Sequence, residues 1–388
     1  MEKVRYGLIG AGAQGGFYAQ WLTGKMGAMP QNAALGALCD IDPDKQIMCE
    51  IMYPDTPFFT DYRQMIASGA VEAVVTTVPH YLHTEIAIYA LEHGMPVLVE
   101  KPAGVYAQAV RRMNECAAAH PDVPFGIMFN QRTNKLYQKL RDIVASGELG
   151  QIRRTNWIIN SWWRPDSYYR QSDWRATWGG EGGGVLVNQA PHQLDLWQWI
   201  CGVPKRVYAK IGYGVGRDIV VDNDVTATVQ YENGATGVFI TCTHDPVGTD
   251  RLEIDLDGGK IVVEDSKKAT VLRFKRSENE MNASMSMESV ARLFMGGGGD
   301  QLYTSEAIEN TDGWGVQHGI VLTNFAAHIL DGTPLLAPGS DGIHGVNLAN
   351  AMLLSSWLGQ EVDLPVDEEL YLAQLNKRIQ QEGKYPTR

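Results

Sequence analysis

Short apolar runs alternate with helical patterns over the first third of the chain. Five such runs predict strands, at 6–9, 33–39, 73–78, 95–99 and 125–129. Between the third and fourth runs, apolar residues recur at helical spacing, and Gly94 lies where a left-handed C-cap would end the helix. Repeated strand–helix alternation predicts a parallel sheet with right-handed crossovers, and ligands bind such sheets at the carboxyl ends of the strands.

The pattern changes after Asn130. Residues 135–147 predict an amphipathic helix that Gly147 closes, and strands follow in which apolar and polar residues alternate. Asn233 and Gly234 separate two of these runs, which indicates a hairpin. Such alternation predicts a mostly antiparallel sheet with one face covered, and the other face is either solvated or an oligomer interface. Three more helices are expected at 323–330, 346–358 and 372–381.

Length and charge narrow the class of protein. A chain of 388 residues is too long for one compact core, so we expect two domains. The net charge is −12 and no large Lys/Arg cluster occurs, which argues against nucleic acid and anionic membranes as partners. The first strand begins near Met1, which leaves no room for a signal peptide, and no long apolar stretch follows. We therefore expect a cytoplasmic protein.

Two further features predict no cofactor chemistry of their own. The five cysteines are scattered, without paired Cys or Cys/His spacing, so no metal site is expected. The glycine run from Gly296 to Gly299 follows no clear strand and opens no clear helix. We expect it to be a loop rather than a phosphate site.

A glycine turn follows the first predicted strand. Gly10 would allow the tight turn, Gly12 would let the backbone approach a pyrophosphate, and Gly15 would let helix and strand pack closely. The unpaired N–H groups of the helix that starts here would then face the phosphates. The spacing alone is weak in a chain with 41 glycines, but its position between a strand and a helix predicts a dinucleotide site.

The second apolar run ends in Asp40. An acidic residue at this strand end hydrogen-bonds the adenosine ribose in dinucleotide-binding units. The alternative is that Asp40 or Asp42 only caps the helix after Pro43. No Arg or Lys follows before Lys45, so a 2′-phosphate would lack a partner, which favours NAD over NADP.

Other strand ends should face the same crevice. Glu100 and Lys101 come directly after the fourth run, although the two could instead be a solvated surface pair. We expect cofactor contacts from the residues at these strand ends, namely Gly10, Gly12, Ala13, Gln14, Gly15, Asp40, Pro79, His83, Glu100, Lys101 and Asn130.

A second informative stretch is GGGVLVNQAPHQLD, at 182–195. The pattern predicts a helix that starts near Asn188, with Pro191 in its first turn. Asn188, His192 and Asp195 would then share one face. A carboxylate one turn from an imidazole can fix its tautomer and raise its basicity. The alternative is a capping Asn, a structural His and a solvated Asp.

Most of the ten tryptophans lie between residues 157 and 199. Flat aromatic faces beside Arg164 and Tyr168 suit a polyhydroxylated ring, which has apolar C–H faces and hydroxyls around its edge. Trp162 and Trp163 are the candidates for ligand contact, and simple packing is the alternative.

The chain resembles the Gfo/Idh/MocA oxidoreductase family, named for glucose–fructose oxidoreductase and inositol dehydrogenase. The resemblance rests on the glycine turn, on the EKP sequence at 100–102, on the helix ending ASGELGQI and on the block at 182–195. The family commonly has Asp and Gly where this chain has Asn188 and Ala190. Because Asn cannot carry charge, we expect position 188 to orient substrate rather than to relay protons.

The resemblance implies an α/β protein with a Rossmann dinucleotide-binding domain at 1–129 and an α+β domain at 130–388. The second domain would hold a large, mostly antiparallel open sheet, bind the substrate, and make the contacts of a homodimer or homotetramer. The implied activity is that of an NAD(P)-dependent dehydrogenase for CH–OH groups, acting on a secondary alcohol of a sugar, inositol or glycoside. Lys101 and His192 would be the catalytic pair.

In this scheme His192 takes the hydroxyl proton as hydride leaves the same carbon, and cationic Lys101 stabilises the developing alkoxide. The implied substrate contacts are Lys101, Trp162, Trp163, Arg164, Tyr168, Asn188 and His192. Two alternatives stay open. The bound NAD could be recycled in an oxidation–elimination or sugar–sugar reaction, or the chain could be a non-catalytic NAD- and sugar-sensing regulator.

Overall fold

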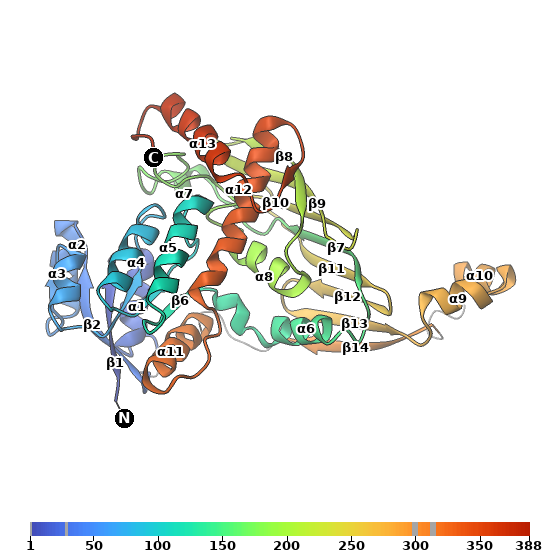
Figure 1. Cartoon of the computed structure of the whole chain (residues 1–388), viewed down its shortest axis with the longest axis horizontal. Coiled ribbons are helices and arrows are strands. Elements are labelled where there is room, and N and C mark those ends of the chain that lie inside the picture. The colour runs from blue at the N-terminus through green and yellow to red at the C-terminus, as the bar shows by residue number, and fades with distance from the viewer. Residues whose placement is uncertain (1, 28–29, 297–301, 311–315) are drawn as a thin grey trace.

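A parallel sheet forms the N-terminal part of the computed structural model, which describes residues 2–27, 30–296, 302–310 and 316–388 (Figure 1). Its six strands follow the order β3-β2-β1-β4-β5-β6. The order reverses between β1 and β4, which opens a crevice at their carboxyl ends. The strands are β1 (Val4–Ile9), β2 (Ala33–Cys39), β3 (Phe58–Phe59), β4 (Ala73–Thr76), β5 (Val97–Val99) and β6 (Phe125–Ile127).

All five predicted strands are present, and the short β3 is additional. The helices between them are α1 (Ala13–Leu22), α2 (Pro43–Met52), α3 (Tyr62–Ala67), α4 (Leu82–Glu92) and α5 (Ala107–Ala119). Gly94 adopts φ +68° two residues after α4, where the sequence predicts a left-handed cap. The predicted parallel doubly wound sheet is confirmed.

The second sheet has nine strands in the order β14-β13-β12-β11-β7-β10-β9-β8-β15. Every neighbouring pair is antiparallel except β7 with β10. Asn233 and Gly234 turn the chain between β9 and β10, as predicted. The strands are β7 (Ile152–Ile159), β8 (Arg206–Tyr213), β9 (Asp222–Gln230), β10 (Thr236–Cys242), β11 (Asp250–Leu256), β12 (Gly259–Glu264), β13 (Lys268–Phe274), β14 (Tyr303–Glu309) and β15 (Val362–Asp363).

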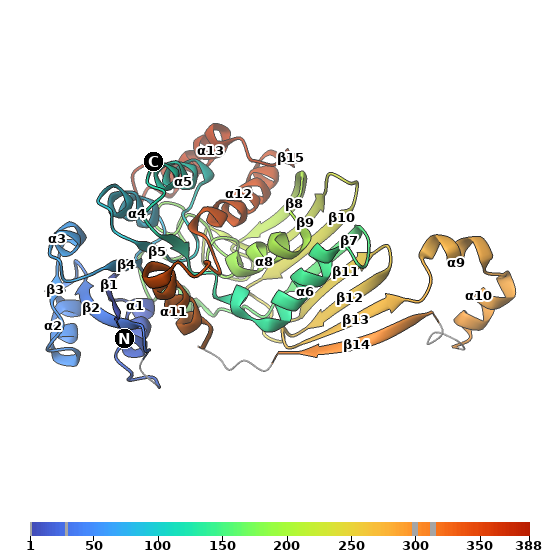
Figure 2. The same ribbon diagram turned by 60° about the horizontal axis from the view of Figure 1, so that its bottom comes forward.

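Helices α6 (Lys135–Ser146), α8 (Pro191–Cys201) and α12 (Gly342–Leu358) lie over one face of this sheet (Figure 2). Trp157 on β7 and Trp197 on α8 are fully buried between the helices and the sheet, and Trp197 stacks on Phe239. The remaining helices are η1 (Asn130–Thr133), α7 (Asp166–Tyr169), α9 (Glu278–Ser284), α10 (Met287–Phe294), α11 (Val316–Asp331), η3 (Gly339–Asp341) and α13 (Glu368–Glu382).

Helices α9 and α10 project beyond the edge of the second sheet (Figures 1 and 2). Apart from Gly296, the predicted glycine loop at 296–299 lies outside the described residues. Within the described ranges, each helix is too short or too polar to span a bilayer.

Helix α11, which follows β14 in the chain, returns to the first sheet. The Tyr6 hydroxyl on β1 donates to the Leu322 carbonyl at 2.8 Å, and Phe325 is buried in the same core. A segment late in the sequence therefore covers part of the Rossmann sheet, next to the crevice.

Arg132 links three segments around that crevice. From η1, its Nε and Nη2 donate to the two carboxylate oxygens of Asp195 on α8, at 2.9 and 2.6 Å. Its Nη1 donates to Asp341, in η3, at 2.6 Å. Arg132 and Asp195 are both at least 97% buried as side chains. The fork holds the end of the first sheet, the start of α12 and the helix that carries His192 in one arrangement.

Replacing Arg132 with Met would leave the Asp195 carboxylate buried without its countercharge. We expect the free energy of unfolding to fall by about 3–5 kcal/mol. Arg153→Met is the matched control, because Arg153 pairs with Asp257 at the surface, where such pairs contribute about 0–1 kcal/mol. Urea unfolding followed by circular dichroism measures both losses. Equal losses in the two variants would contradict the role of Arg132.

Candidate functional site

The glycine turn after β1 leaves no space for side chains at two positions. Gly10 has φ +102°, and a Cβ there would lie 2.5 Å from the Thr77 carbonyl oxygen. A Cβ on Gly15 would lie 1.9 Å from the Gly10 carbonyl oxygen. The Thr77 hydroxyl donates to that same carbonyl at 2.6 Å. The turn, helix α1 and the end of β4 are therefore packed at backbone distance.

Gly12 differs, because a Cβ there would meet nothing within 4 Å. Gly12 is the N-cap of α1, which has no side-chain cap and no acidic residue in its first turn. Ala13 and Gln14 lie in that turn, and Gly12 and Ala13 line a hollow of about 340 Å³ between α1 and α2. Unpaired N–H groups beside open space fit a dinucleotide pyrophosphate.

Asp40 ties the end of β2 to the glycine turn. One carboxylate oxygen accepts the Ala11 N–H at 2.7 Å, and the other accepts the Asp42 N–H at 3.0 Å. Asp42, rather than Asp40, caps α2 by accepting the Asp44 N–H. Asp40 is therefore not the helix cap, and it lies beside the turn where the sequence predicts a ribose contact.

His83 and Glu100 hold neighbouring strand ends together. The ring nitrogens of His83 lie 2.7 and 2.8 Å from the carbonyl oxygens of Pro102 and Val78. Glu100 is buried, accepts the Lys101 N–H at 2.9 Å and is hydrogen-bonded by the Tyr18 hydroxyl. Glu100 was predicted to face the crevice, and its hydrogen bonds show that it also joins β5 to α1.

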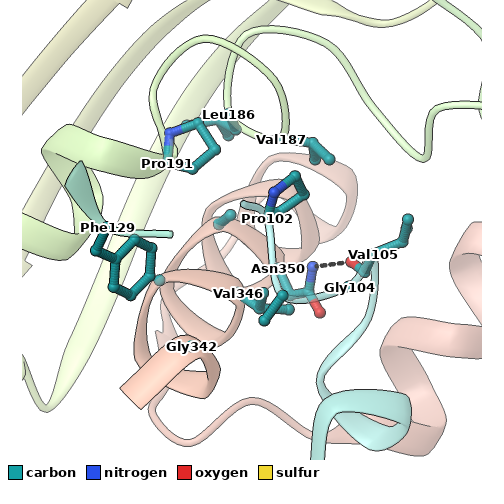
Figure 3. Close-up of a pocket in the computed structure, with 13 residues that line it drawn as sticks. Pro102, Gly104, Val105, Phe129, Leu186, Val187, Pro191, Gly342, Val346 and Asn350 are labelled. Carbon is teal, nitrogen blue, oxygen red and sulfur yellow. Dashed lines mark hydrogen bonds between the residues drawn. The ribbon is translucent and has the colours of Figure 1, made fainter. Parts of the chain in front are cut away.

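The segment after Lys101 rests on α12 (Figure 3). Asn350 donates to the Val105 carbonyl at 3.0 Å and accepts the Ala107 N–H at 2.9 Å. A Cβ on Gly342 would lie 2.5 Å from that of Ala103, so only glycine permits this approach. Leu186, Val187 and Pro191, which precede His192, line the same small apolar pocket as Pro102. One helix thus supports the segments that carry Lys101 and His192.

Lys101 points toward the stretch at 182–195. Its Nζ donates to the Asn188 carbonyl oxygen at 3.0 Å. Burial lowers the pKa of Lys101, and the carboxylates of Glu100 and Glu181 oppose that shift. These two acids favour the cationic form of the lysine.

Two predictions around His192 are wrong. Helix α8 begins at Pro191, and Asn188 lies in the preceding turn, where its N–H donates to the Gly184 carbonyl at 2.9 Å. Asp195 does not orient His192, because the fork of Arg132 engages both of its oxygens. Because Asn188 lies outside α8, only His192 and Asp195 share that helix, and helical spacing cannot identify a partner that comes from another element.

His192 is a neutral imidazole in this setting. Burial lowers its pKa well below the ordinary value, and electrostatic repulsion from Lys101 and His318 lowers that pKa further. Its Nδ1 is buried, with no hydrogen-bond partner in the described part of the chain. An imidazole with an unengaged nitrogen near an ammonium group can accept a proton from a bound hydroxyl.

Glu181 is a site residue that the sequence reasoning missed. It is 2% exposed, accepts the Ala176 N–H at 2.6 Å and is hydrogen-bonded by the Asn188 side-chain amide. The Nη1 atom of Arg175 lies 3.8 Å from the Oε1 atom of Glu181. Burial raises the pKa of Glu181 to about 7. Its position beside a glycine run carries no signal of burial, which arises only from tertiary packing.

His318 was also missed, because it comes from α11, far along the chain. The Asn130 side-chain amide lies 3.1 Å from its Nε2, and its ring packs edge-on against Phe17. Burial and the charge of Lys101 lower its pKa to about 4. His318 therefore brings α11 into the electrostatic surroundings of Lys101.

The predicted aromatic residues are distributed unevenly. Trp162 packs against the core, and Trp163 is 46% exposed. Trp174, which the prediction did not select, lies edge-on to His80, and the guanidinium of Arg175 lies over its ring.

Tyr168 carries a guanidinium on its ring from each of two arginines. Arg164 and Arg175 lie 5.0 and 4.7 Å from its centroid. The Tyr168 hydroxyl accepts from Arg175 and from the Gln189 amide, so this wall is continuous with the turn of Asn188.

Among the described residues, no cluster of His, Cys, Asp and Glu is arranged to hold a metal ion.

The chain belongs to the Gfo/Idh/MocA oxidoreductase family. Residues 4–126 match the profile described as an oxidoreductase family with an NAD-binding Rossmann fold, and residues 137–262 match the GFO/IDH/MocA C-terminal domain. The resemblance inferred from the EKP sequence and the GGG block is therefore confirmed.

Relatives with given activities cover about half of the chain. Inositol 2-dehydrogenase of Burkholderia multivorans is 30% identical over 205 residues, which are 51% of this chain and 55% of that protein. The same enzyme of Corynebacterium glutamicum is 24% identical over 201 residues, 52% of this chain and 55% of that protein. The matched region thus spans little more than half the length of these relatives.

Solved structures extend the likeness in fold to nearly the whole chain. Levoglucosan dehydrogenase in complex with NADH and L-sorbose has a TM-score of 0.76 at 19% identity, covering 94% of this chain and 100% of its own. WlbA dehydrogenase from Bordetella pertussis, in complex with NADH and UDP-GlcNAcA, has a TM-score of 0.74 at 22% identity, covering 94% and 100%. At these identities the likeness concerns the fold alone.

The open space at Gly12 makes a test of the glycine turn possible. In Gly12→Ala the new methyl group meets no protein atom but occupies the approach to a pyrophosphate, so we expect NADH affinity to fall about tenfold, ~1.4 kcal/mol. NADH fluorescence titration measures the affinity, and thermal unfolding should be unchanged.

Gly10→Ala is the matched control, since its methyl group would strike the Thr77 backbone at a positive φ and should lower the unfolding temperature. NADH binding by Gly12→Ala at the wild-type affinity would exclude this turn as the pyrophosphate site.

Proposed function

We propose that the protein is an NAD-dependent dehydrogenase that oxidises a secondary alcohol of a sugar, inositol or glycoside. The observation that carries the proposal is the coupling of a lysine, held by the Asn188 carbonyl, to a neutral and unengaged His192. Lys101 follows β5 of the first sheet and His192 lies on α8, which covers the second sheet, and both lie beside the dinucleotide crevice. A cation and a base near one carbinol are what alcohol oxidation requires.

His192 is the proposed general base. Its lowered pKa keeps it deprotonated at neutral pH, so it can accept the substrate hydroxyl proton without first losing one. A positioned base contributes roughly 10²–10⁴ in rate. When bound, the nicotinamide supplies the acceptor for the hydride that leaves the alcohol carbon.

Lys101 is the proposed electrostatic partner. Its ammonium group would stabilise the oxygen as negative charge develops on it, a contribution of about 3 kcal/mol for a preorganised donor. The hydrogen bond to the Asn188 carbonyl fixes the direction of the ammonium group before substrate arrives. The ammonium group then needs less reorientation when the alcohol reacts.

The proposed substrate class rests on the wall beside this pair and on the relatives. Tyr168, Trp174 and two guanidinium groups present flat surfaces and donors, which suit the C–H faces and hydroxyls of a sugar ring. Arg164, Tyr168 and Asn188 are the proposed substrate contacts, with Trp162 and Trp163 as outer candidates. The partly matching relatives are named for inositol oxidation.

NAD is the proposed cofactor, in preference to NADP. Asp40 presents a carboxylate at the end of β2, and such a group disfavours a 2′-phosphate while it can accept a ribose hydroxyl. The cofactor contacts proposed from the sequence are retained, with Gly12, Ala13 and Gln14 at the pyrophosphate. Initial rates with NAD and NADP at equal concentration test this preference.

A panel of monosaccharides, glycosides and inositols, assayed by NADH absorbance, tests the activity. We expect one polyol class to reduce NAD. His192→Ala should lower kcat roughly 10²–10⁴-fold, because the proton acceptor is lost. Lys101→Met should still bind NADH yet lose most turnover, on the order of 10²-fold.

His93→Ala is the matched control for this test, since His93 is exposed at the end of α4 and should leave kcat unchanged. Near-normal turnover in His192→Ala would refute its role as base. Tightly bound NAD with turnover but no net NADH would indicate a recycled cofactor. NAD binding with no reaction on any alcohol would favour a sensor.

We also propose that the uncovered face of the second sheet joins copies of the chain into a homodimer or homotetramer. Partly exposed apolar residues such as Val238 and Ile240 lie on this face, opposite buried Phe239. Val238→Arg should lower the oligomer mass measured by light scattering, because a charge would be buried at the contact. A monomeric wild type would refute the interface.

A further inference from the structure

Position 188 poses an electrostatic problem for the proposed reaction. Lys101 is an ammonium group partly removed from water, and its hydrogen bond goes to the backbone carbonyl of Asn188, whose side chain is an uncharged amide. A buried cation is costly unless a carboxylate lies within reach. Among the described residues, the acids that act on Lys101 are Glu100 and Glu181.

Glu100 is committed elsewhere. It accepts the Lys101 backbone N–H and the Tyr18 hydroxyl, so it serves to join β5 to α1. Asp222, a third buried acid near the site, is also committed, because its two oxygens accept the N–H groups of Gly184 and Leu186 at 2.6 and 2.9 Å. Neither carboxylate bonds a side chain that faces the substrate.

Glu181 has a different arrangement. One of its oxygens accepts the Ala176 N–H, and the other is bonded by the side-chain amide of Asn188. The backbone carbonyl of the same Asn188 receives the Lys101 ammonium. The side chain of Asn188 is thus engaged by the Glu181 carboxylate and its backbone carbonyl by the Lys101 ammonium group, so that only Asn188 lies between Glu181 and Lys101 in this hydrogen-bond chain.

We propose that Glu181 is a positioning residue of the alcohol dehydrogenase site: through Asn188 its negative charge holds Lys101 in place and in the cationic form. The inference rests on the proposed function and assigns to Glu181 the carboxylate that position 188 lacks. Asn188 connects Glu181 to Lys101, because the charge-assisted hydrogen bond from its side-chain amide also restricts the position of its backbone carbonyl. Glu181 does not touch the reacting carbon and acts only through Asn188 and Lys101.

Other charged and titratable groups contribute to this balance. Those facing Glu181 from the elements packed on it are Arg175, Asp222, His80, Lys101 and Tyr169. Those facing Lys101 are Glu100, Glu181, Arg164, Arg175, His80, His83, His192 and His318. Burial lowers the pKa of all four histidines, so none adds a second cation at neutral pH.

The sign of the pH dependence follows. Burial raises the pKa of Glu181 to about 7, so protonation removes its charge as the pH falls through that value, and kcat should fall with it. The pKa of His192 lies well below this range, so the limb near pH 7 belongs to Glu181. At high pH, kcat falls as Lys101 loses its proton. Without the charge of Glu181, this loss should occur at lower pH.

Glu181→Gln tests the proposal, because it removes the charge and keeps the shape. Its single amide oxygen can still accept the Ala176 N–H, and its NH2 group can pair with the Asn188 side-chain oxygen if that amide rotates. At pH 8 we expect kcat to fall about tenfold with KM changed less than about threefold, the loss of the acid limb near pH 7, and an alkaline limb about one unit lower. Glu181→Gln combined with Asn188→Asp moves the charge one hydrogen bond nearer to Lys101, and should restore kcat to within about threefold of wild type.

Asp250→Asn is the matched control. Asp250 is a partly buried carboxylate that accepts from Trp157 and Ser266, away from Lys101, so its loss can affect stability but should leave both limbs in place. Uniformly lower activity in Glu181→Gln with unmoved limbs would mean that Glu181 only supports the fold, and would overturn the proposal.

A second readout does not depend on the substrate. The pH titration of the Lys101 Cε resonance in ¹³C-lysine-labelled protein, assigned with Lys101→Met, gives the lysine pKa directly. We expect that pKa to fall by about one unit in Glu181→Gln and to stay constant in Asp250→Asn. An unchanged pKa in Glu181→Gln would refute the proposal. A wild type inactive on every alcohol would refute the proposed function alone, since the titration still decides the role of Glu181.

Discussion

The arrangement of the crevice depends on one buried guanidinium. Arg132 lies just beyond the last strand of the first sheet, and its fork reaches Asp195 on α8 and Asp341 before α12. A charge at this depth is tolerated only where its donors are satisfied, so the three segments cannot separate without exposing an unpaired ion to an apolar core. The relative position of the two sheets near the site is therefore set by electrostatics as much as by apolar contact. Asp195 serves this junction rather than the imidazole beside it.

Helix α12 makes the junction rigid on the other side. Gly342 lets the segment after Lys101 approach closely at Ala103, and Asn350 satisfies the backbone of that segment at Val105 and Ala107. A buried amide with both groups engaged permits little movement of the strand end that it holds. Lys101 and the turn before His192 therefore share one support, and a displacement of α12 would move both together.

The fold was predictable where its determinants are local. The helix closed by Gly147, which adopts φ +72°, and the hairpin at Asn233-Gly234 follow from turn chemistry and apolar spacing. The start of α8 was not, because Asp222 on β9 takes the N–H groups of Gly184 and Leu186 and holds the turn before the helix. Glu181 and His318 were missed for the same reason. Their place in the site comes from contacts between segments, and no single stretch of sequence contains that information.

The site also shows why one lysine and one histidine divide the work. Burial lowers the pKa of each imidazole around the site, and because charges interact strongly where water is excluded, a single ammonium group lowers that pKa further. Lys101 acts in this way on His80, His83, His192 and His318. A second cation is thereby disfavoured, and the imidazoles stay available as neutral bases. Burial would favour loss of the proton of Lys101 itself if no carboxylate opposed it, so the acids beside the lysine are as necessary to the arrangement as the lysine is.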